Sequence, residues 1–422
     1  MKKVLIITYY WSPAGGSGVQ RWLKFVKYFR DFGIEPVIYT VENPNYPIED
    51  TSLVYEIPKD IKVLKQPIWE PNNLFSIFKK NKQSAGFLNP NPSFFGKLLQ
   101  YIRANYFIPD ARKFWIKPSV QYLKEYLAST HINTIITTGP PHSMHLIGLS
   151  LKQKIGVKWI ADFRDPWTEI DYFHQLPLTK KAIQKHKKLE FEVLKNASAV
   201  TVVGNTMKKS FEKVNAKTYV VTNGYDFETN KLNYNLDEKF LLTHIGLMNS
   251  DRNHPVFWEA ISELIQDNSN LKKDLEINLI GKVANEVNES ILKYNLQSKV
   301  NLISYLQHNE VVKHQQKSQV LLLFVNHVPS AKGILTGKIF EYLNAKRPIL
   351  AIAPTNGDLA EIILETNSGE VIDFNDKIAL KTVILNRYAK YKTGELNVSS
   401  KNIEKYHRKE LTKKYASIIK QL

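Results

Sequence analysis

The 422-residue sequence contains no cysteine and no long apolar run. The absence of cysteine excludes disulfide bonds, zinc sites with thiolate ligands and cysteine nucleophiles, and it fits a reducing compartment. No apolar stretch approaches the ~20 residues that cross a bilayer, so we do not expect an integral membrane protein. Low-complexity tracts and short internal repeats are also lacking. What remains is a globular composition, with 43% hydrophobic and 23% charged residues.

Negative charge is in short supply. The formal net charge is +18 and the pI is about 9.5, which indicates an anionic partner such as nucleic acid, an acidic lipid surface or a phosphorylated substrate. The basic residues are spread along the chain, without a zinc finger, an RNP-like strand or a basic arm. We therefore expect no nucleic-acid partner and favour a membrane surface or a phosphate group.

The first apolar run, VLIIT at residues 4–8, follows a basic MKK and precedes Ser-Pro-Ala. It fits either a short signal peptide or a first buried strand. We favour the strand, because Trp22, Phe25 and Phe29 next show helical spacing and a second apolar run, PVIYTV, then completes a βαβ unit.

Two successive series of short β-branched runs predict two domains. The first series is VLIIT, PVIYTV, IKVLK, TIITTG, WIADF, AVTVVG and TYVVTNG; the second is FLLTHIG, LEINLIG, VNLISYL, VLLLFV, PILAIAP and GEVIDF. A polar, turn-rich linker, ETNKLNYNLDEK at residues 228–239, separates them. Short strands that alternate with helices are typical of mostly parallel sheets. We predict an α/β fold of two Rossmann-like domains that face each other across a cleft.

One region interrupts the alternation. Residues 70–130 mix aromatic and basic residues with Asn and Pro, which predicts an inserted helical region. Its segment 94–126 either packs on the sheet with solvated lysines or contacts a membrane surface. At the end of the sequence, YHRKELTKKYASIIKQL predicts a basic amphipathic helix.

A glycine-rich turn, YYWSPAGGSGVQRW at residues 9–22, links the first strand to the first helix. As a dinucleotide fingerprint it is poor, because Arg21 stands where the third glycine belongs, and no Gly-Lys-Ser/Thr follows to make a P-loop. Gly15, Gly16 and Gly18 would still let backbone N–H groups approach an anion at the helix N-terminus. Both a tight turn and an anion-binding loop fit these residues.

A pair of histidines follows the fourth run of the first series. TTGPPHSMHL, residues 137–146, places His142 and His145 three residues apart, on one face of a helix that begins there. Without cysteines or an H-E-x-x-H motif, we expect no metal site. Ordinary packing at a helix start and a hydrogen bond from one histidine to a substrate both fit.

Charged residues end the next strand. WIADFRDPW, residues 159–167, carries Asp162, Arg164 and Asp165 to the carboxyl end of a hydrophobic strand, where open α/β sheets bind ligands. Two carboxylates beside an arginine can position a hydroxyl group or accept a proton. The alternative is a structural Asp–Arg pair, with Asp165 capping the chain before Pro166.

The first strand of the second series has a similar ending. In THIGLMNSDRNHPVFWEAI, residues 243–261, Gly246 leaves room at the turn. Arg252 follows at a position where a guanidinium group can grip a diphosphate. Taken alone, this pattern is weak.

The stretch SAKGILTGKIFEYLNAKRPILAIAP, residues 330–354, carries the most specific pattern. A loop that ends in Thr336 and Gly337 enters a helix with Lys338 and Glu341 one turn apart, on the same side. Free N–H groups and a lysine suit a diphosphate, and a glutamate one turn further can accept hydrogen bonds from ribose hydroxyls.

This last stretch resembles the donor-site signature of family 4 glycosyltransferases, nucleotide-sugar enzymes with the two-domain GT-B fold. The pattern K-x-F-E-Y-x-x-x-x-x-P-I-L is matched by Lys338, Phe340, Glu341, Tyr342 and residues 348–350. The resemblance extends to the other four motifs and the terminal helix. It implies an acceptor-binding domain at 1–228 with the helical insertion at about 70–130, a nucleotide-sugar-binding domain at 229–400, and a helix at 401–422 that crosses back to the first domain.

The resemblance also implies roles for individual residues. Glu341 would hold the donor ribose, and Arg252 and Lys338 would neutralise the departing diphosphate. The residues assigned to the donor in this way are Gly16, Gly18, Gly246, Arg252, Tyr305, Leu306, Thr336, Gly337, Lys338 and Glu341, of which Tyr305 and Leu306 border the base.

Two positions depart from the family pattern. Many members carry a glutamate where this sequence has Gly333, and many place a histidine where Arg164 stands. The acceptor-side polar contact would then come from Asp165, Asp162 or His142. We therefore take Asp165, Arg164, Asp162 and His142 as the candidate catalytic residues.

The function that the resemblance implies is transfer of a sugar from a UDP- or GDP-linked donor to a glycan or lipid-linked acceptor. It implies retention at the anomeric carbon, no cofactor, no obligatory metal, and domain closure around the donor. The setting we expect is cell-surface polysaccharide synthesis, such as lipopolysaccharide or capsule, in the cytoplasm or at the inner face of the membrane. A non-catalytic nucleotide-sugar or glycan-binding subunit is the alternative, and an NAD(P)-dependent oxidoreductase is disfavoured by Arg21.

Overall fold

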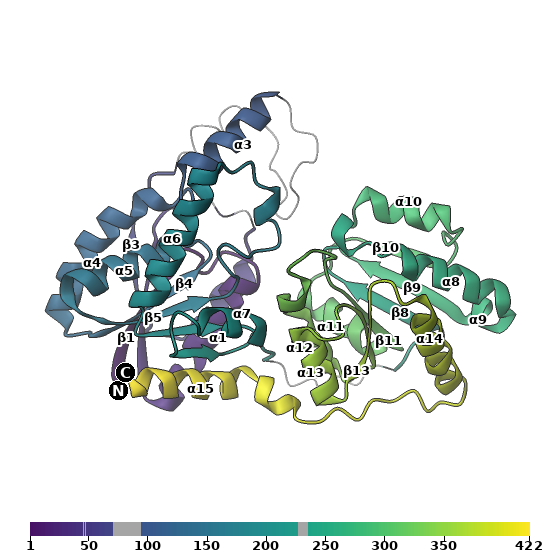
Figure 1. The fold of residues 1–422 in the computed structure, drawn as a ribbon. Helices are drawn as coiled ribbons and strands as arrows, with labels where there is room; N and C mark the ends of the chain where they lie inside the picture. The colour runs from purple at the N-terminus through teal and green to yellow at the C-terminus, as the bar shows by residue number, and fades with distance from the viewer. Residues whose placement is uncertain (45, 47, 71–93, 227–234) are drawn as a thin grey trace. The chain divides into compact units, whose positions relative to one another are not determined.

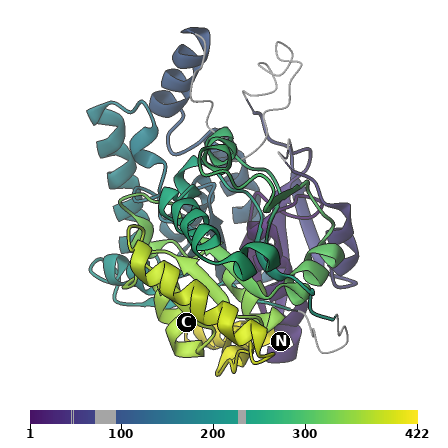
Figure 2. The same ribbon diagram turned by 90° about the vertical axis from the view of Figure 1, so that its right-hand side faces the viewer.

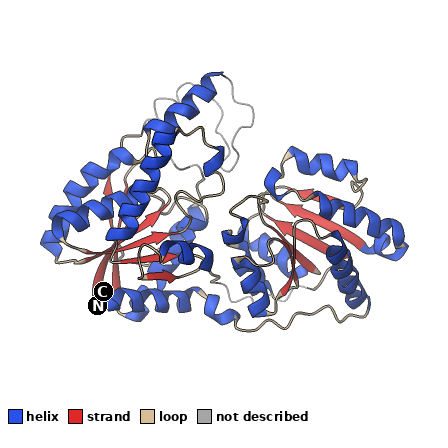
Figure 3. Cartoon of the chain, in the orientation of Figure 1, coloured by secondary structure: helices blue, strands red, loops and turns tan. Residues whose placement is uncertain are grey.

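The computed structural model describes residues 1–44, 46, 48–70, 94–226 and 235–422, which form two compact units (Figure 1). The first unit comprises Met1–Asn223 and Arg408–Leu422, and the second comprises Gly224–His407. Part of the expected insertion, residues 71–93, and most of the expected linker, residues 228–234, lie outside the described ranges. Helices cover both faces of each sheet (Figure 3).

Seven parallel strands form the sheet of the first unit, in the order β3-β2-β1-β4-β5-β6-β7. Apolar residues follow one another along the central strands because helices bury both faces of the sheet. The run VLIIT lies mostly in β1, in the middle of this sheet. The strands are β1 (Lys2–Ile7), β2 (Ile34–Val41), β3 (Lys62–Gln66), β4 (Thr134–Gly139), β5 (Lys158–Phe163), β6 (Ala199–Val202) and β7 (Thr218–Val220).

Helix α1 shows why the first unit folds as it does. Its apolar residues recur at helical spacing and are buried against the sheet and the last helix, with Trp22, Phe25 and Phe29 fully covered. Gly33, in the left-handed conformation, ends the short 3₁₀ turn that follows and leads into β2. The helices of this unit are α1 (Ser17–Phe29), α3 (Phe94–Tyr106), α4 (Ile116–Thr130), α5 (Ser143–Ile155), α6 (Lys180–Asn196), α7 (Asn205–Phe211) and α15 (Arg408–Gln421).

Six parallel strands form the second sheet, in the order β10-β9-β8-β11-β12-β13. The strands are β8 (Phe240–Ile245), β9 (Leu275–Ile280), β10 (Val300–Ile303), β11 (Val320–Phe324), β12 (Ile349–Ile352) and β13 (Gly369–Ile372). The helices are α8 (Pro255–Asp267), α9 (Ser269–Asp274), α10 (Asn285–Lys293), α11 (His308–Lys317), α12 (Lys338–Ala345), α13 (Asp358–Thr366) and α14 (Lys377–Lys392). The predicted α/β fold with two Rossmann-like domains is confirmed.

The segment 94–126, for which both packing on the sheet and contact with a membrane surface were open, contains two different structures. Helix α4 packs on the first sheet: Val120 and Leu123 are buried, and Tyr39 of β2 stacks on Trp115 just before the helix and donates a hydrogen bond to Ser119, 2.8 Å away. Helix α3, by contrast, has no buried residue. Packing on the sheet therefore explains α4 and leaves α3 unexplained.

The last helix, α15, belongs to the first unit, where it packs against α1. The ring of Tyr415 lies between 5.3 and 6.1 Å from those of Trp22, Phe25 and Phe29. The Lys2 ammonium donates to the carbonyl of Ile419 at 2.7 Å. Both ends of the chain thus lie side by side on the first unit (Figures 1 and 2).

Candidate functional site

Both sheets reverse their strand order at one point. In the first unit the reversal lies between β1 and β4, and in the second between β8 and β11. Connections from such neighbouring strands leave on opposite faces of the sheet, so a crevice opens at the carboxyl ends of the strands, where open α/β sheets bind ligands. Most of the residues expected to be functional lie in the loops that follow these strands or the next strand along.

In the first unit, the side chain of Arg164 fills the space beside the glycine-rich turn. Gly16 has φ of 102°, which favours glycine, and a side-chain carbon at Gly18 would overlap the guanidinium group of Arg164. The same guanidinium group donates to the carbonyl of Pro140, and the backbone N–H of Arg164 donates to Gly139 at 3.1 Å. The structure thus brings Gly18 and Arg164 together beside the turn after β4.

Asp162 is the fully buried centre of a hydrogen-bond network. Arg21 donates to both of its oxygens at 2.8 and 3.3 Å, and the indole N–H of Trp22 donates at 3.1 Å. The hydroxyls of Thr138 and Thr201 donate at 3.0 and 2.8 Å. Burial alone would raise the pKa of Asp162, but Arg21 and the two hydroxyls outweigh it and lower the pKa.

This network leaves Asp162 no oxygen for a substrate. Arg21 also donates to the carbonyl of Thr222 at 2.9 Å and to the side chain of Asn223 at 3.3 Å, where the chain leaves the first unit. Of the two interpretations open for Asp162, the geometry therefore favours the structural Asp–Arg pair, and the partner is Arg21 rather than Arg164.

His142 and His145 lie on α5 or at its start, and both are buried. His142 stacks on Trp167, with ring centroids 4.6 Å apart, and Nδ1 of His145 pairs with Thr137 at 2.9 Å. Nδ1 of His142 and Nε2 of His145 have no hydrogen-bond partner in the described chain, and both would crowd a side chain at Gly139. Burial lowers the pKa of both imidazoles, to about 3 for His145, so both are neutral.

Asp165 is the solvent-accessible acid of this group. The surrounding protein keeps some water from its carboxylate and so raises the pKa of Asp165, while the positive charge of Arg164 opposes the rise. The loop that carries it is anchored two residues later: the carboxylate of Glu190 on α6 accepts from the backbone N–H groups of Trp167 and Thr168, each at 3.2 Å. Asp165 is therefore an exposed group on a fixed loop.

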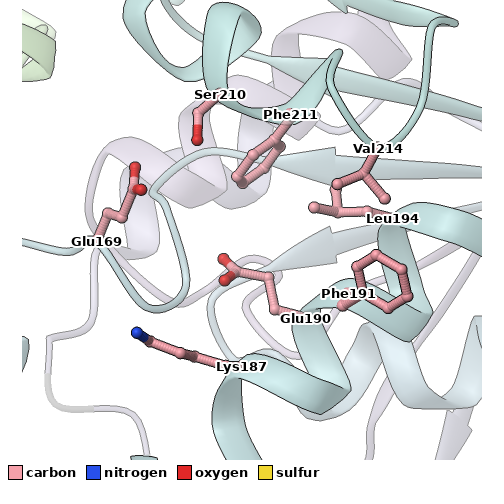
Figure 4. Close-up of a pocket in the computed structure, with 8 residues that line it drawn as sticks. All are labelled: Glu169, Lys187, Glu190, Phe191, Leu194, Ser210, Phe211 and Val214. Atoms are coloured by element: carbon pink, nitrogen blue, oxygen red, sulfur yellow. The ribbon is translucent and has the colours of Figure 1, made fainter. Parts of the chain in front are cut away.

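Behind this loop lies a small hollow of about 160 Å³ between α6 and α7 (Figure 4). The side chains of Glu169, Glu190, Phe191 and Phe211 contribute to its wall. Ligand sites usually occupy ~300–1,000 Å³, and none of the residues expected from the sequence lines this hollow. It marks the back of the loop rather than a substrate site.

In the second unit the side chain of Lys338 packs against Gly246. Gly246, at the end of β8, has φ of 105°, and a side-chain carbon there would lie 2.7 Å from Nζ of Lys338 at the start of α12. Burial and the nearby Arg252 lower the pKa of Lys338 to about 7, while Glu341 opposes them. An ammonium group that is buried beside another cation is stabilised in its charged form by a nearby anion.

Arg252 connects the two strands of the reversal. It donates to the side-chain oxygen of Asn326, just after β11, and to the carbonyl of Leu247, just after β8, both at 2.7 Å. Sequence analysis missed Asn326, although a polar residue directly after the run VLLLFV was a usable signal. Tyr342 joins the same strands to α12: its hydroxyl accepts from the N–H of Ile245 at 3.1 Å and donates to Leu322 at 3.3 Å.

Gly337 is a glycine that the fold does not require. Its φ of −59° and ψ of −24° suit any residue, and a side-chain carbon there would meet nothing within 4 Å. It lies at the N-terminus of α12, beside the hydroxyl of Thr336, which accepts from the N–H of Lys338 at 3.4 Å. The start of a helix attracts anions through the helix dipole, and a glycine there lets a ligand approach the backbone closely.

The remaining expected donor residues fall into two places. Glu341 lies one turn after Lys338 and accepts a hydrogen bond from Gln315 of α11 at 3.3 Å, a partner that sequence analysis also missed. Tyr305, which is 84% exposed, and Leu306 follow the edge strand β10, two strands away from β8. The structure thus gathers Gly246, Arg252, Thr336, Gly337, Lys338 and Glu341 and leaves Tyr305 and Leu306 on a separate loop.

No group of three or more His, Asp or Glu side chains in the described ranges is placed to hold a metal ion. Within the same ranges, every helix is too short or too polar to span a bilayer.

Comparison with known proteins gives a fold but no sequence family. No protein-family model matches the chain, and no curated protein matches it in sequence. Its structure is similar to that of a sucrose-phosphate synthase from Thermosynechococcus elongatus, with 15% identity, a TM-score of 0.64 and coverage of 100% of this chain and 99% of that chain. It is also similar to the lipopolysaccharide outer core galactosyltransferase WaaB, with 12% identity, a TM-score of 0.61 and coverage of 100% and 99%.

A third similar structure carries ligands. It is a variant of TarM from S. aureus in complex with Fondaparinux, alpha-GlcNAc-glycerol and UDP, with 13% identity, a TM-score of 0.59 and coverage of 99% of both chains. At these identities the likeness is one of fold: two parallel-sheet Rossmann-like domains, as in GT-B glycosyltransferases.

Proposed function

We propose that the chain is a glycosyltransferase that moves a sugar from a nucleotide-sugar donor to a glycan or lipid-linked acceptor. The observation that carries the proposal is the cluster at the N-terminus of α12. There an unobstructed glycine, Gly337, adjoins Lys338, which is packed on Gly246 beside Arg252. Support also comes from the glycosyltransferases among the similar structures and from the UDP bound in one of them.

The cluster suits the departing diphosphate of a donor. Lys338 and Arg252 supply positive charge at the start of α12, where the helix dipole also favours an anion, so charge that develops on the leaving group is stabilised. Glu341, one turn further along α12, would accept from the ribose hydroxyls. From the resemblance of this motif we propose family 4 membership and retention at the anomeric carbon. We also propose metal-independent transfer, because the two cations can take the place of a metal at the diphosphate.

We place the acceptor on the first unit. Asp165 is exposed on an anchored loop, with Arg164 beside it. Asp162 enters the proposal as a positioning residue, because its oxygens are taken by protein groups. His142 is buried and neutral, and its Nδ1, which has no hydrogen-bond partner in the described chain, is covered by protein beside Gly139.

The cellular setting is proposed at the same level. Cell-surface polysaccharide synthesis, for example of lipopolysaccharide or capsule, fits the proposed donor and the likeness to WaaB. A cytoplasmic protein that reaches the inner membrane face would fit the net charge of +18.

A non-catalytic nucleotide-sugar-binding subunit is the second candidate. It is favoured by Gly333, which provides no carboxylate where many family members have one, and by the full set of protein partners of Asp162.

Titration of the full chain with UDP, GDP and NADH, followed by UDP- and GDP-sugars with lipid-linked acceptors, tests the proposal. We expect UDP or GDP to bind, and Glu341→Ala to weaken that binding by ~1–3 kcal/mol through loss of the ribose contacts, as calorimetry would measure. Nucleotide binding without sugar transfer would favour the second candidate. Binding of NADH alone would refute both.

A further inference from the structure

Helix α3 turns its apolar side to solvent. At 100° per residue its seven large apolar side chains fall within an arc of about 160°. They are 37% to 81% exposed and comprise Phe94, Phe95, Leu98, Leu99, Tyr101, Ile102 and Tyr106. Of the four better-covered residues, Gly96, Gln100 and Ala104 share the opposite side, and Asn105, in the last turn, lies within the arc. A helix that packs in a domain core buries its apolar side, so α3 is oriented the other way round.

Hydrogen bonds from Asn105 attach the last turn of α3 to the start of α6. The side chain of Asn105 donates to the carbonyl of Pro177 at 2.8 Å and accepts from the N–H of Thr179, the residue that caps α6, at 2.7 Å. Figures 1 and 2 show α3 at the outer end of the first unit, beyond the start of α6. Specific contacts thus attach α3 at its last turn, while its seven apolar side chains stay exposed.

Aromatic residues continue the apolar arc. The ring of Phe107 lies 6.0 Å from that of Phe114, which meets the 56% exposed Trp69 edge-on at 4.8 Å. The ammonium of Lys113 lies 5.1 and 5.0 Å from the centroids of the two phenylalanine rings. Exposed aromatic rings beside lysines are the composition that residues at a membrane interface show.

The two segments that form most of this surface carry charge of one sign. Residues 94–109 and 177–189, which include α3 and the start of α6, contain no Asp or Glu. Their cationic residues are Lys97, Arg103, Lys180, Lys181, Lys185, Lys187 and Lys188, all exposed. Lys185 lies close enough to Lys113 to help lower the pKa of Lys113. The start of α6 and the aromatic residues therefore belong to one surface.

We infer that this surface, formed by α3, Phe107, Phe114, Trp69 and the first turns of α6, docks on an anionic lipid bilayer. The apolar arc would enter the interface between headgroups and acyl chains, and the lysines would face the anionic headgroups. The charge favours a bilayer over a second copy of the chain, because two copies would bring the same positive charges together. The biological meaning rests on the proposed function, since a lipid-linked acceptor would lie in the same bilayer.

Co-sedimentation of the full chain with vesicles of phosphatidylcholine and phosphatidylglycerol tests the inference. We expect binding to mixed vesicles at low salt, weaker binding at high salt, and little binding to pure phosphatidylcholine. The variant F95Q/L99Q should bind at least tenfold more weakly. The matched control is L364Q/I378Q, which removes two exposed apolar residues, 68% and 79% exposed, from the second unit and should bind like the native chain.

Equal binding of F95Q/L99Q and the native chain, or no binding of the native chain to anionic vesicles, would overturn the inference. So would concentration-dependent dimers, seen by light scattering without lipid and lost in F95Q/L99Q. Nucleotide titration of the same variant separates this outcome from a failure of the proposed function, because α3 lies in the first unit and the donor cluster in the second.

Discussion

The lowered pKa of Lys338 predicts that donor binding takes up a proton. In the unliganded chain the pKa is about 7, so about nine-tenths of the lysines are neutral at pH 8. A phosphate charge ~4 Å away contributes ~4 kcal/mol at an effective dielectric constant of ~20, which raises the pKa by about three units. At pH 8 the bound form should hold about 0.9 more protons than the free form.

This proton uptake sets the pH dependence of affinity. The dissociation constant for a nucleotide-sugar should be about tenfold higher at pH 8 than at pH 6, or ~1.4 kcal/mol. A nucleotide-sugar is the right ligand, because neither phosphate of its diphosphate bridge titrates in this range. Calorimetry in two buffers with different ionisation heats measures the proton uptake directly. Lys338→Arg should abolish both effects, because arginine stays charged.

The same lysine should lower the stability of the unliganded protein. The unfolded chain binds more protons than the folded chain between about pH 7 and the ordinary lysine pKa of 10.5, so stability should rise with pH across that window. Lys338→Met should therefore raise the free energy of unfolding at neutral pH by at most ~4 kcal/mol, which a higher melting temperature would show. The same substitution should remove donor affinity. Equal affinities at pH 6 and pH 8 with no buffer dependence, or near-native affinity in Lys338→Met, would refute this account.

Three further substitutions test other parts of the structure. Gly337→Ala should leave the free energy of unfolding unchanged or raise it by up to ~1 kcal/mol, as thermal melting would measure. It should weaken nucleotide binding at least tenfold in titrations. Native affinity would show that no ligand approaches Gly337. Asp165→Asn should lower the turnover rate with unchanged donor affinity, and native turnover would remove Asp165 from the site. Arg21→Met should lower the unfolding free energy in urea by ~3–5 kcal/mol because it strands a buried carboxylate, and adding Asp162→Asn should restore part of the loss; additive effects would contradict a shared network.

The strands were predictable because each one needs only a local pattern. Parallel strands covered on both faces require successive apolar residues, as in β1 and β11, and the turn residues between them mark the boundaries. The expected functions of the loops after β8 and before α12 came from residues close together in sequence, such as Lys338 and Glu341. Their roles remain proposals, but their proximity in the structure follows from one helix turn.

What sequence analysis missed depends on contacts between distant elements. Arg21 looks like a fault in a glycine fingerprint, yet it pairs with Asp162 on a different strand. Nothing near Gly18 in sequence shows that the guanidinium of Arg164 fills the space above it. The segment containing α3 and α4 shows the same limit: periodicity identifies an apolar side of a helix but not what covers it.

The return of α15 to the first unit also has a consequence for synthesis on the ribosome. Leu411 and Tyr415 complete the core of a domain whose other residues precede Gly224, and the second unit lies between them in sequence. While the second unit is being translated, Trp22 and Phe29 lack the helix that covers them. The first domain therefore reaches its final state only after residues 408–421 emerge, and until then its exposed aromatic side chains are a target for chaperones.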